Sequence, residues 1–270
     1  MQQQQFAQQN NLQQFQMYPQ QQFGQQQFGQ FGFQFPFPFQ FPFQYQFQPG
    51  VPNNILQGQS NYLEGDWNKM IGNMNKMIGN GNNVLGSVNI VKGDLNSIEG
   101  DKNGAIGSGN QISGTTNGAA GNLNTIKGSE NLVTGHQNIA VGKGNGLEGH
   151  QNLIVGQNNG VGGNLNFAFG NDNTLGGNGN QGAGNGNAII GNWNIFNGDN
   201  NIASGDNNIL QGQFNTLFGN QNGVIGQNNQ VAGNQNNVKG DKNYLTGDRQ
   251  FVMGSGNVIN SSPSNLQKAF

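Results

Sequence analysis

Residues 129–156 read SENLVTG-HQNIAVG-KGNGLEG-HQNLIVG, four consecutive heptads of the form x-x-N-x-Φ-x-G, in which Φ is an apolar residue. The glycine recurs at every seventh position from Gly58 to Gly254 without interruption, which gives twenty-nine glycines in register. The asparagine column has thirty positions, and only Gln250 departs from it. The Φ column is apolar everywhere except at Gly182. A fixed period with fixed residue types at fixed phases indicates a repeat architecture.

The heptad does not fit a coiled coil, because it has one apolar position and contains an obligate Gly and Asn, which are poor helix formers. In an extended segment, N-x-Φ-x-G places Asn, Φ and Gly on one side and the two x residues on the other. Each heptad therefore predicts one short strand followed by a turn at the glycine. Since one strand buries a single side chain, we expect two heptads to form a coil whose two Φ side chains meet inside.

The predicted fold is all-β: a parallel β-solenoid, or β-roll, with 14 residues per coil from two heptads, stacked by parallel strand pairing. Inside it the asparagine column is expected to form a structural ladder, represented by Asn138, Asn152 and Asn166. A buried primary amide must satisfy its donors and its acceptor, and identical amides one coil above and below can do so. We interpret the Asn and Gly columns as scaffold rather than as a functional site.

The unit x-x-N-x-V-x-G resembles the heptad of the grass ice-recrystallisation-inhibition proteins, a family of plant antifreeze proteins, over residues 52–260. The resemblance implies a left-handed β-roll with two heptads per coil, an apolar centre and asparagine ladders. It also implies that the outward residues flanking Φ contact ice, where the family has largely Thr and Ser on one flat face. A looser similarity exists to the repeats of trimeric autotransporter adhesin heads, which lack this asparagine column.

Threonine is sparse at the outward positions of this chain. It occupies only five of the sixty positions that flank Φ, namely Thr125, Thr134, Thr174, Thr216 and Thr246. Thr125 and Thr134 belong to adjacent heptads, so we expect them on opposite faces. The sequence therefore predicts no continuous threonine ladder of the kind that an ice-binding surface needs.

Large apolar residues gather at the outward positions of three consecutive coils, since residues 14 apart are expected to stack on one face. The block consists of Ile139, Val141, Leu153, Val155, Phe167 and Phe169. A contiguous group of this size exceeds what scattered surface hydrophobic residues require, and it predicts a contact patch. Two interpretations stay open: a protein interface, or a surface covered by the Phe-rich arm of the same chain.

The N-terminal arm, residues 1–50, has no charged side chain and contains twenty-one Gln and twelve Phe, a composition typical of disordered, prion-like segments. An aromatic residue occupies every second position over one stretch: Phe31, Phe33, Phe35, Phe37, Phe39, Phe41, Phe43, Tyr45 and Phe47. The interspersed prolines cannot donate ladder hydrogen bonds, which favours an extended or polyproline-like arm over a central strand. The aromatic row is interpreted either as a set of contacts for self-association or a partner, or as a low-complexity spacer.

The sequence thus predicts three parts: the disordered Gln/Phe/Pro-rich arm at 1–50, the heptad-repeat β-solenoid at 52–260, and a C-terminal cap or tail at 261–270. Within the solenoid, Gly182 leaves the Φ column without a side chain. We expect a gap there, with local fraying or a bend.

Composition excludes several classes of function. Charged residues make up 8% of the chain, the net charge is −2 and basic residues are scattered singly, which argues against binding nucleic acid through its phosphates. There is no cysteine, so neither disulfides nor thiolate metal sites are expected. No apolar stretch approaches the roughly 20 residues that span a bilayer, and no secretory signal is recognisable, so no membrane partner is expected and an intracellular location is the default expectation.

The sequence contains no recognisable catalytic constellation. His136 and His150 are 14 apart in the same phase and should stack on adjacent coils, but two ligands without a third make a poor metal site. The turn aspartates are expected to form Asx turns and lack the spacing of calcium-binding β-rolls: Asp66, Asp94, Asp101, Asp199, Asp206, Asp241 and Asp248. We predict that the chain is not an enzyme and needs no cofactor or metal.

Two functions from different classes remain. The main prediction is a structural, self-assembling or protein-interaction solenoid, which contacts itself or another protein through the apolar patch and the Gln/Phe arm. The alternative prediction is an ice-binding protein that inhibits ice recrystallisation.

Overall fold

The computed structural model describes residues 54–260, so the predicted arm at 1–50 and the predicted cap at 261–270 lie outside the described residues. Within the described range the chain forms thirty short strands and no helix. The solenoid belongs to the second of two units into which the chain divides, Met1–Val51 and Pro52–Phe270. The predicted all-β, parallel β-solenoid is confirmed.

The strands alternate between two parallel sheets of fifteen strands, which we call sheet 1 and sheet 2. Sheet 1 contains β1 (Ile55–Gln57), β3 (Lys69–Ile71), β5 (Asn83–Leu85), β7 (Ser97–Glu99), β9 (Gln111–Thr115), β11 (Thr125–Ser129), β13 (Ile139–Lys143), β15 (Leu153–Gln157), β17 (Phe167–Phe169), β19 (Gln181–Ala183), β21 (Ile195–Asn197), β23 (Ile209–Gln211), β25 (Gly223–Ile225), β27 (Asn237–Lys239) and β29 (Phe251–Met253). Sheet 2 contains β2 (Tyr62–Glu64), β4 (Lys76–Ile78), β6 (Ile90–Lys92), β8 (Gly104–Ile106), β10 (Gly118–Ala120), β12 (Leu132–His136), β14 (Gly146–His150), β16 (Gly160–Asn164), β18 (Thr174–Gly176), β20 (Ala188–Ile190), β22 (Ile202–Ser204), β24 (Thr216–Phe218), β26 (Gln230–Ala232), β28 (Tyr244–Thr246) and β30 (Val258–Asn260).

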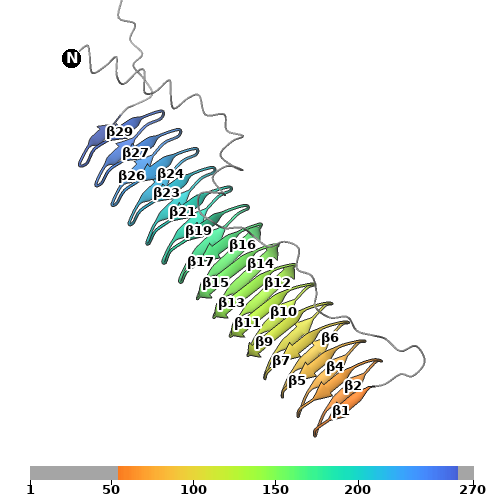
Figure 1. The fold of residues 1–270 in the computed structure, drawn as a ribbon. Helices are drawn as coiled ribbons and strands as arrows, with labels where there is room; N and C mark the ends of the chain where they lie inside the picture. The colour runs from red at the N-terminus through yellow and green to blue at the C-terminus, as the bar shows by residue number, and fades with distance from the viewer. Residues whose placement is uncertain (1–53, 261–270) are drawn as a thin grey trace, which may run out of the picture. The chain divides into compact units, whose positions relative to one another are not determined.

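Strand pairing has one register throughout the solenoid. Each strand pairs with the strand two further along the chain, so that partners lie one coil apart, as Leu56 does with Met70 and Ile154 with Ala168. The coils stack in a straight, regular array (Figure 1). At a strand spacing of about 4.8 Å, fifteen coils make a rod about 70 Å long. Long sheets of this kind twist unless side-chain ladders hold them flat.

The Φ side chains form the core between the sheets. From Met70 to Val252 every apolar member of this column is buried, with exposed fractions between 0% and 4%. The column is confined to one side chain per strand because the residues on either side of Φ point outward. The interior is therefore narrow, and each coil depends on the coils above and below it.

A second buried column consists of the asparagines, and Asn152 is representative. Its Nδ2 donates to Asn138 Oδ1 one coil earlier at 3.1 Å and to the Gly163 carbonyl at 2.7 Å, while its backbone N–H donates to Asn138 Oδ1 at 3.0 Å. Its Oδ1 accepts from the backbone and the side chain of Asn166 at 3.0 and 3.2 Å. Gly163 ends the next strand, on the opposite sheet, so each amide links two coils and both sheets. The predicted ladder is confirmed.

The glycine column occupies the corner at the end of each strand, and Gly142 illustrates why no other residue fits. Its φ is +131°, a conformation that residues with a Cβ rarely adopt. A Cβ at this position would also overlap the carbonyl oxygen of Gly156, the equivalent glycine one coil later. Two independent constraints therefore select glycine here.

The predicted gap at Gly182 is absent, and that prediction was wrong. Strands β17, β19 and β21 remain paired in the common register through Gly182. The ring of Phe196, one coil later in the same column, lies where a Cβ of Gly182 would be. Phe196 is 2% exposed and is the largest fully buried side chain of the core. One large side chain thus fills the space of two Φ positions.

The turns carry a third ladder of side chains, at the outer edges of the solenoid. For six of the seven turn aspartates the carboxylate accepts from the backbone N–H of the residue 14 earlier, as Asp199 does from Asn185 at 2.8 Å and Asp206 from Asn192 at 2.7 Å. The prediction of Asx turns within a single coil was therefore wrong. These side chains tie one coil to the next at the edges of the solenoid.

Candidate functional site

The outward residues of each strand form the two candidate surfaces, because the inner columns are fully used by the scaffold. On sheet 1 the register aligns Ile139 with Leu153 and Phe167, and Val141 with Val155 and Phe169, on β13, β15 and β17. The structure therefore brings together all six residues of the predicted apolar patch. Val155 is 37% exposed and the other five are half-buried. Their role in a protein contact stays a prediction.

Charged residues are unevenly distributed over the two sheets. Eight charged side chains occupy the outward positions that flank Φ: Lys69, Glu99, Lys127 and Lys239 on sheet 1, and Glu64, Lys76, Lys92 and Glu148 on sheet 2. Because β13 also ends in the exposed Lys143, sheet 1 is free of outward charge on six consecutive strands, β15 to β25. Sheet 2 is free of outward charge on eight consecutive strands, β16 to β30.

The uncharged stretch of sheet 2, which we call the hydroxyl face, consists of the outward residues of β16 to β30. It carries four Ser or Thr side chains, Thr174, Ser204, Thr216 and Thr246, and the phenol of Tyr244. Small residues lie beside them: a Cβ added to Gly160, Gly162 or Gly176 would have no neighbour within 4 Å. The uncharged stretch of sheet 1 has no outward Ser or Thr, so the two faces differ in chemistry at the same height of the rod.

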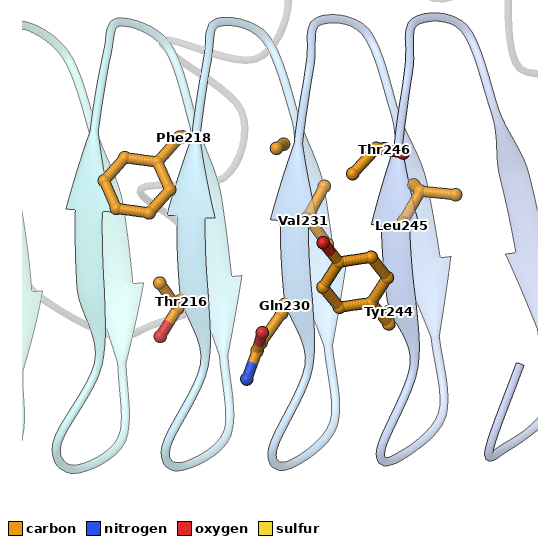
Figure 2. Close-up of a pocket in the computed structure, with 8 residues that line it drawn as sticks. Thr216, Phe218, Gln230, Val231, Tyr244, Leu245 and Thr246 are labelled. Atoms are coloured by element: carbon orange, nitrogen blue, oxygen red, sulfur yellow. The ribbon is translucent and has the colours of Figure 1, made fainter. Parts of the chain in front are cut away.

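The hydroxyl face is uneven toward its C-terminal end. The aromatic rings of Phe218 and Tyr244 stand on either side of β26 and are 53% and 45% exposed (Figure 2). Together with Thr216, Gln230 and Ala232 they border an open hollow of about 160 Å³. From β16 to β22 no aromatic side chain projects from the outward positions, and the largest exposed side chains there are Ile190 and Ile202, so the N-terminal half of this face carries smaller side chains than the rest.

Comparison with known proteins adds the deciding observation. The model of the grass antifreeze β-roll family matches residues 48–139 and again residues 133–226, which together make up more than half of the chain. The chain belongs to the grass antifreeze β-roll family. No individual curated protein matched it. Membership of this family supports the alternative prediction, ice binding, better than the main prediction of an assembly protein.

In this antifreeze β-roll the two histidines lie as predicted, on adjacent coils. His136 pairs with His150 in register, with ring centroids 5.1 Å apart and an angle of 6° between the ring planes. His136 Nδ1 accepts from the backbone N–H of Asn122 at 3.0 Å. Within residues 54–260 no group of three or more His, Cys, Asp or Glu side chains is placed to hold a metal ion. No helix in that range is long and apolar enough to cross a membrane.

Sequence reasoning overlooked the hydroxyl face of the antifreeze β-roll, although the signal was present. Over both faces together threonine is sparse, since it occupies five of the sixty positions that flank Φ. Sorting the outward residues by alternate heptads separates the sheets and shows that Thr174, Thr216 and Thr246 share one uncharged face. The distribution of charge, rather than the number of threonines, identifies this surface.

Proposed function

We propose that this chain is a non-catalytic ice-binding protein and that ice contacts the hydroxyl face, chiefly the part with smaller side chains from β16 to β22. The observation that carries the proposal is the run of eight strands without an outward charge on a straight sheet that also bears Thr174, Ser204, Thr216 and Thr246. Membership of the grass antifreeze β-roll family supports the same class of function.

The absence of charge favours contact with a solid. Binding to ice replaces the liquid hydration shell of a surface by the fixed lattice, and removing water from a charged group is far more costly than removing it from a hydroxyl or methyl group. Regular spacing matters as well, because stacked strands repeat outward positions every ~4.8 Å along the rod. A surface held by buried ladders loses little conformational entropy when it binds.

Side-chain size favours sheet 2 over sheet 1. On the hydroxyl face Gly160, Gly162 and Gly176 leave the surface low, and Thr174 adds one hydroxyl and one methyl group. On sheet 1 at the same height Phe167 and Phe169 project from a single strand. A flat lattice plane can approach small side chains closely, whereas large rings hold it away from their neighbours.

The test introduces charge into the hydroxyl face. The double variant Thr174→Lys and Ser204→Lys places two ammonium groups on β18 and β22. We expect the protein concentration needed to inhibit ice recrystallisation to rise about tenfold, which corresponds to about 1.4 kcal/mol of binding free energy. The measurement is the growth of ice grains at constant subzero temperature as a function of protein concentration.

The matched control is Gln181→Lys with Gln211→Lys. It places the same two charges on β19 and β23 of sheet 1, at the same height and separation. We expect the control to retain inhibition. If both double variants lose activity equally, or if the unaltered chain does not inhibit recrystallisation, the hydroxyl face is not the ice-binding surface.

A further inference from the structure

The two ends of the solenoid expose groups that every interior coil covers. Strands β1 and β2 lie at one end of the two sheets, and β29 and β30 at the other. Leu56, the first member of the Φ column, is 50% exposed, whereas Met70, its partner on the next coil, is 0% exposed. At the other end Ile259, the last member of the Φ column, is only partly buried, whereas Leu245, its partner on the coil before, is 1% exposed. Within residues 54–260, each end therefore presents a cross-section of the apolar core that no further coil covers.

In the part of the chain that the structure describes, the first coil has backbone donors without an acceptor. In the interior each corner glycine donates its N–H to the coil before it, as Gly72 does to the Gln57 carbonyl and Gly79 to the Glu64 carbonyl, both at 3.0 Å. For Gly58 and Gly65 no such acceptor exists among the described residues, because they end the first two strands. Among residues 54–260, the N-terminal end is thus a sheet edge without a partner strand.

The last coil has a complementary set of groups. The amide of Asn243 donates both to Asn229 Oδ1 at 3.0 Å and to the Gly254 carbonyl at 2.9 Å. The amide of Asn257 donates to Asn243 Oδ1 at 2.9 Å, but the described residues contain no glycine carbonyl for its second N–H. The acceptor that this amide would meet in a further coil is a corner glycine equivalent to Gly58.

We propose that the C-terminal end of one solenoid stacks on the N-terminal end of a second copy, so that both sheets continue across the junction. In this arrangement the Leu56 side chain of the second copy takes the rung after Val252, and Leu63 takes the rung after Ile259. The corner at Gly58 then receives the Asn257 amide. Every pairing repeats one that the interior coils already make, which is why the partner is this same chain.

Electrostatics do not oppose the junction. Strands β29 and β30 carry no charged residue, and β1 and β2 carry only Glu64, which would align with the uncharged Asn260. The contact joins two different ends, so it does not close on itself and extends into a linear array. Such an array lengthens the hydroxyl face without altering any outward residue, and it does not depend on whether that face binds ice.

The test places a carboxylate in the junction from either side. Leu56→Asp and Ile259→Asp each alter an inward position of a terminal strand, where the junction would bury the charge. Ile55→Asp and Val258→Asp are the matched controls, because they add the same charge to outward positions of the same two strands. Sedimentation of the full chain over a wide concentration range reports association, and circular dichroism reports whether the strands are retained.

We expect the weight-average mass of the unaltered chain and of both controls to rise about twofold or more with concentration, as an open array requires. Each inward variant alone should stay at the monomer mass of 28.8 kDa. Mixing the two inward variants should restore dimers and nothing larger, since each retains one intact end. Dimers in the mixture would also show that the unaltered end of each variant is still folded, so that local fraying does not explain the loss of association.

Three outcomes overturn the proposal. An unaltered chain that stays monomeric, as it would if residues 261–270 cap the end, leaves no junction to explain. Association that persists in both inward variants would come from another part of the chain, such as the aromatic row at 31–47. Inward variants that each stay monomeric alone and do not associate when mixed would show that the two intact ends do not contact each other.

Discussion

The inner columns of the solenoid and its outer faces are built from the same thirty strands, yet they tolerate change very differently. Inside, each column keeps one class of residue, asparagine, glycine or apolar, because equivalent groups stack above and below it at a fixed distance. Outside, residues on the same strands range from glycine to phenylalanine and lysine. Stacking therefore dictates the interior, and only the outward positions are free to specify what the molecule binds.

The largest difference in stability is expected between substitutions at two glycines, one at a corner of the coil and one at an outward position of a strand. Gly142→Ala should destabilise the solenoid by more than about 4 kcal/mol, because the backbone conformation and the Gly156 carbonyl both exclude a Cβ. Gly162→Ala, on an outward position with open space around it, should change stability by less than about 1 kcal/mol. Thermal unfolding followed by circular dichroism compares the two. Equal losses of stability would show that corner and outward glycines tolerate an added Cβ equally well.

Phe196 gives the next largest effect, because one side chain fills two rungs of the core. Phe196→Ala should cost about 4 kcal/mol, within the roughly 3–5 kcal/mol of large-to-small core changes. Gly182→Ala should cost roughly 1–3 kcal/mol, since the added methyl group meets the Phe196 ring. Combining Gly182→Val with Phe196→Val restores one medium side chain per rung. Chemical denaturation should find this pair less destabilised than the sum of its single changes, and strict additivity would contradict the shared space.

A single inner amide is expected to matter slightly less. Asn152→Ala leaves the Gly163 carbonyl and the Asn166 backbone N–H unsatisfied, at roughly 1–3 kcal/mol for each buried group, so we expect a loss of about 3 kcal/mol. The control is Asn164→Ala, which removes an amide from an exposed turn where water can replace it, at a cost below about 1 kcal/mol. Hydrogen exchange of the coils around each site localises the effect. If Asn164→Ala destabilised the solenoid as much as Asn152→Ala, the outer ladder would contribute as much to stability as the inner one.

The fold could be predicted from the sequence because the interior is periodic. Every seven residues the same constraints select Gly, Asn and an apolar residue. The coil length, the pairing of the sheets and the Asn152 ladder therefore all follow from the pattern. The failure at Gly182 has the opposite cause. The Phe196 ring fills the space that Gly182 leaves one coil earlier in the same column. A prediction that treats each position separately misses this compensation.

The candidate site could be predicted only in part, for a related reason. The six residues of the apolar patch are large and adjacent, so their spacing alone brings them together. The hydroxyl face is defined by what it lacks: no charge from Gly160 to Asn260 on one sheet. That property appears only after the outward residues are assigned to sheets. The outer turn ladder was misassigned because Asp199 is suited to bonds both within its own coil and to the coil before it.

The smallest expected effect is a gain, and it tests the outer face without disturbing the interior. Gly160→Thr with Ala188→Thr would place threonines on either side of Thr174, on β16, β18 and β20, where the register aligns all three. We expect the concentration needed to inhibit ice recrystallisation to fall about threefold, or roughly 0.6 kcal/mol of binding free energy. Gln111→Thr with Ile139→Thr builds the same ladder around Thr125 on sheet 1, beside Lys127. No gain is expected there, because the neighbouring ammonium group keeps its liquid hydration. If both ladders improve inhibition equally, the number of aligned threonines matters and the charge of the surrounding face does not.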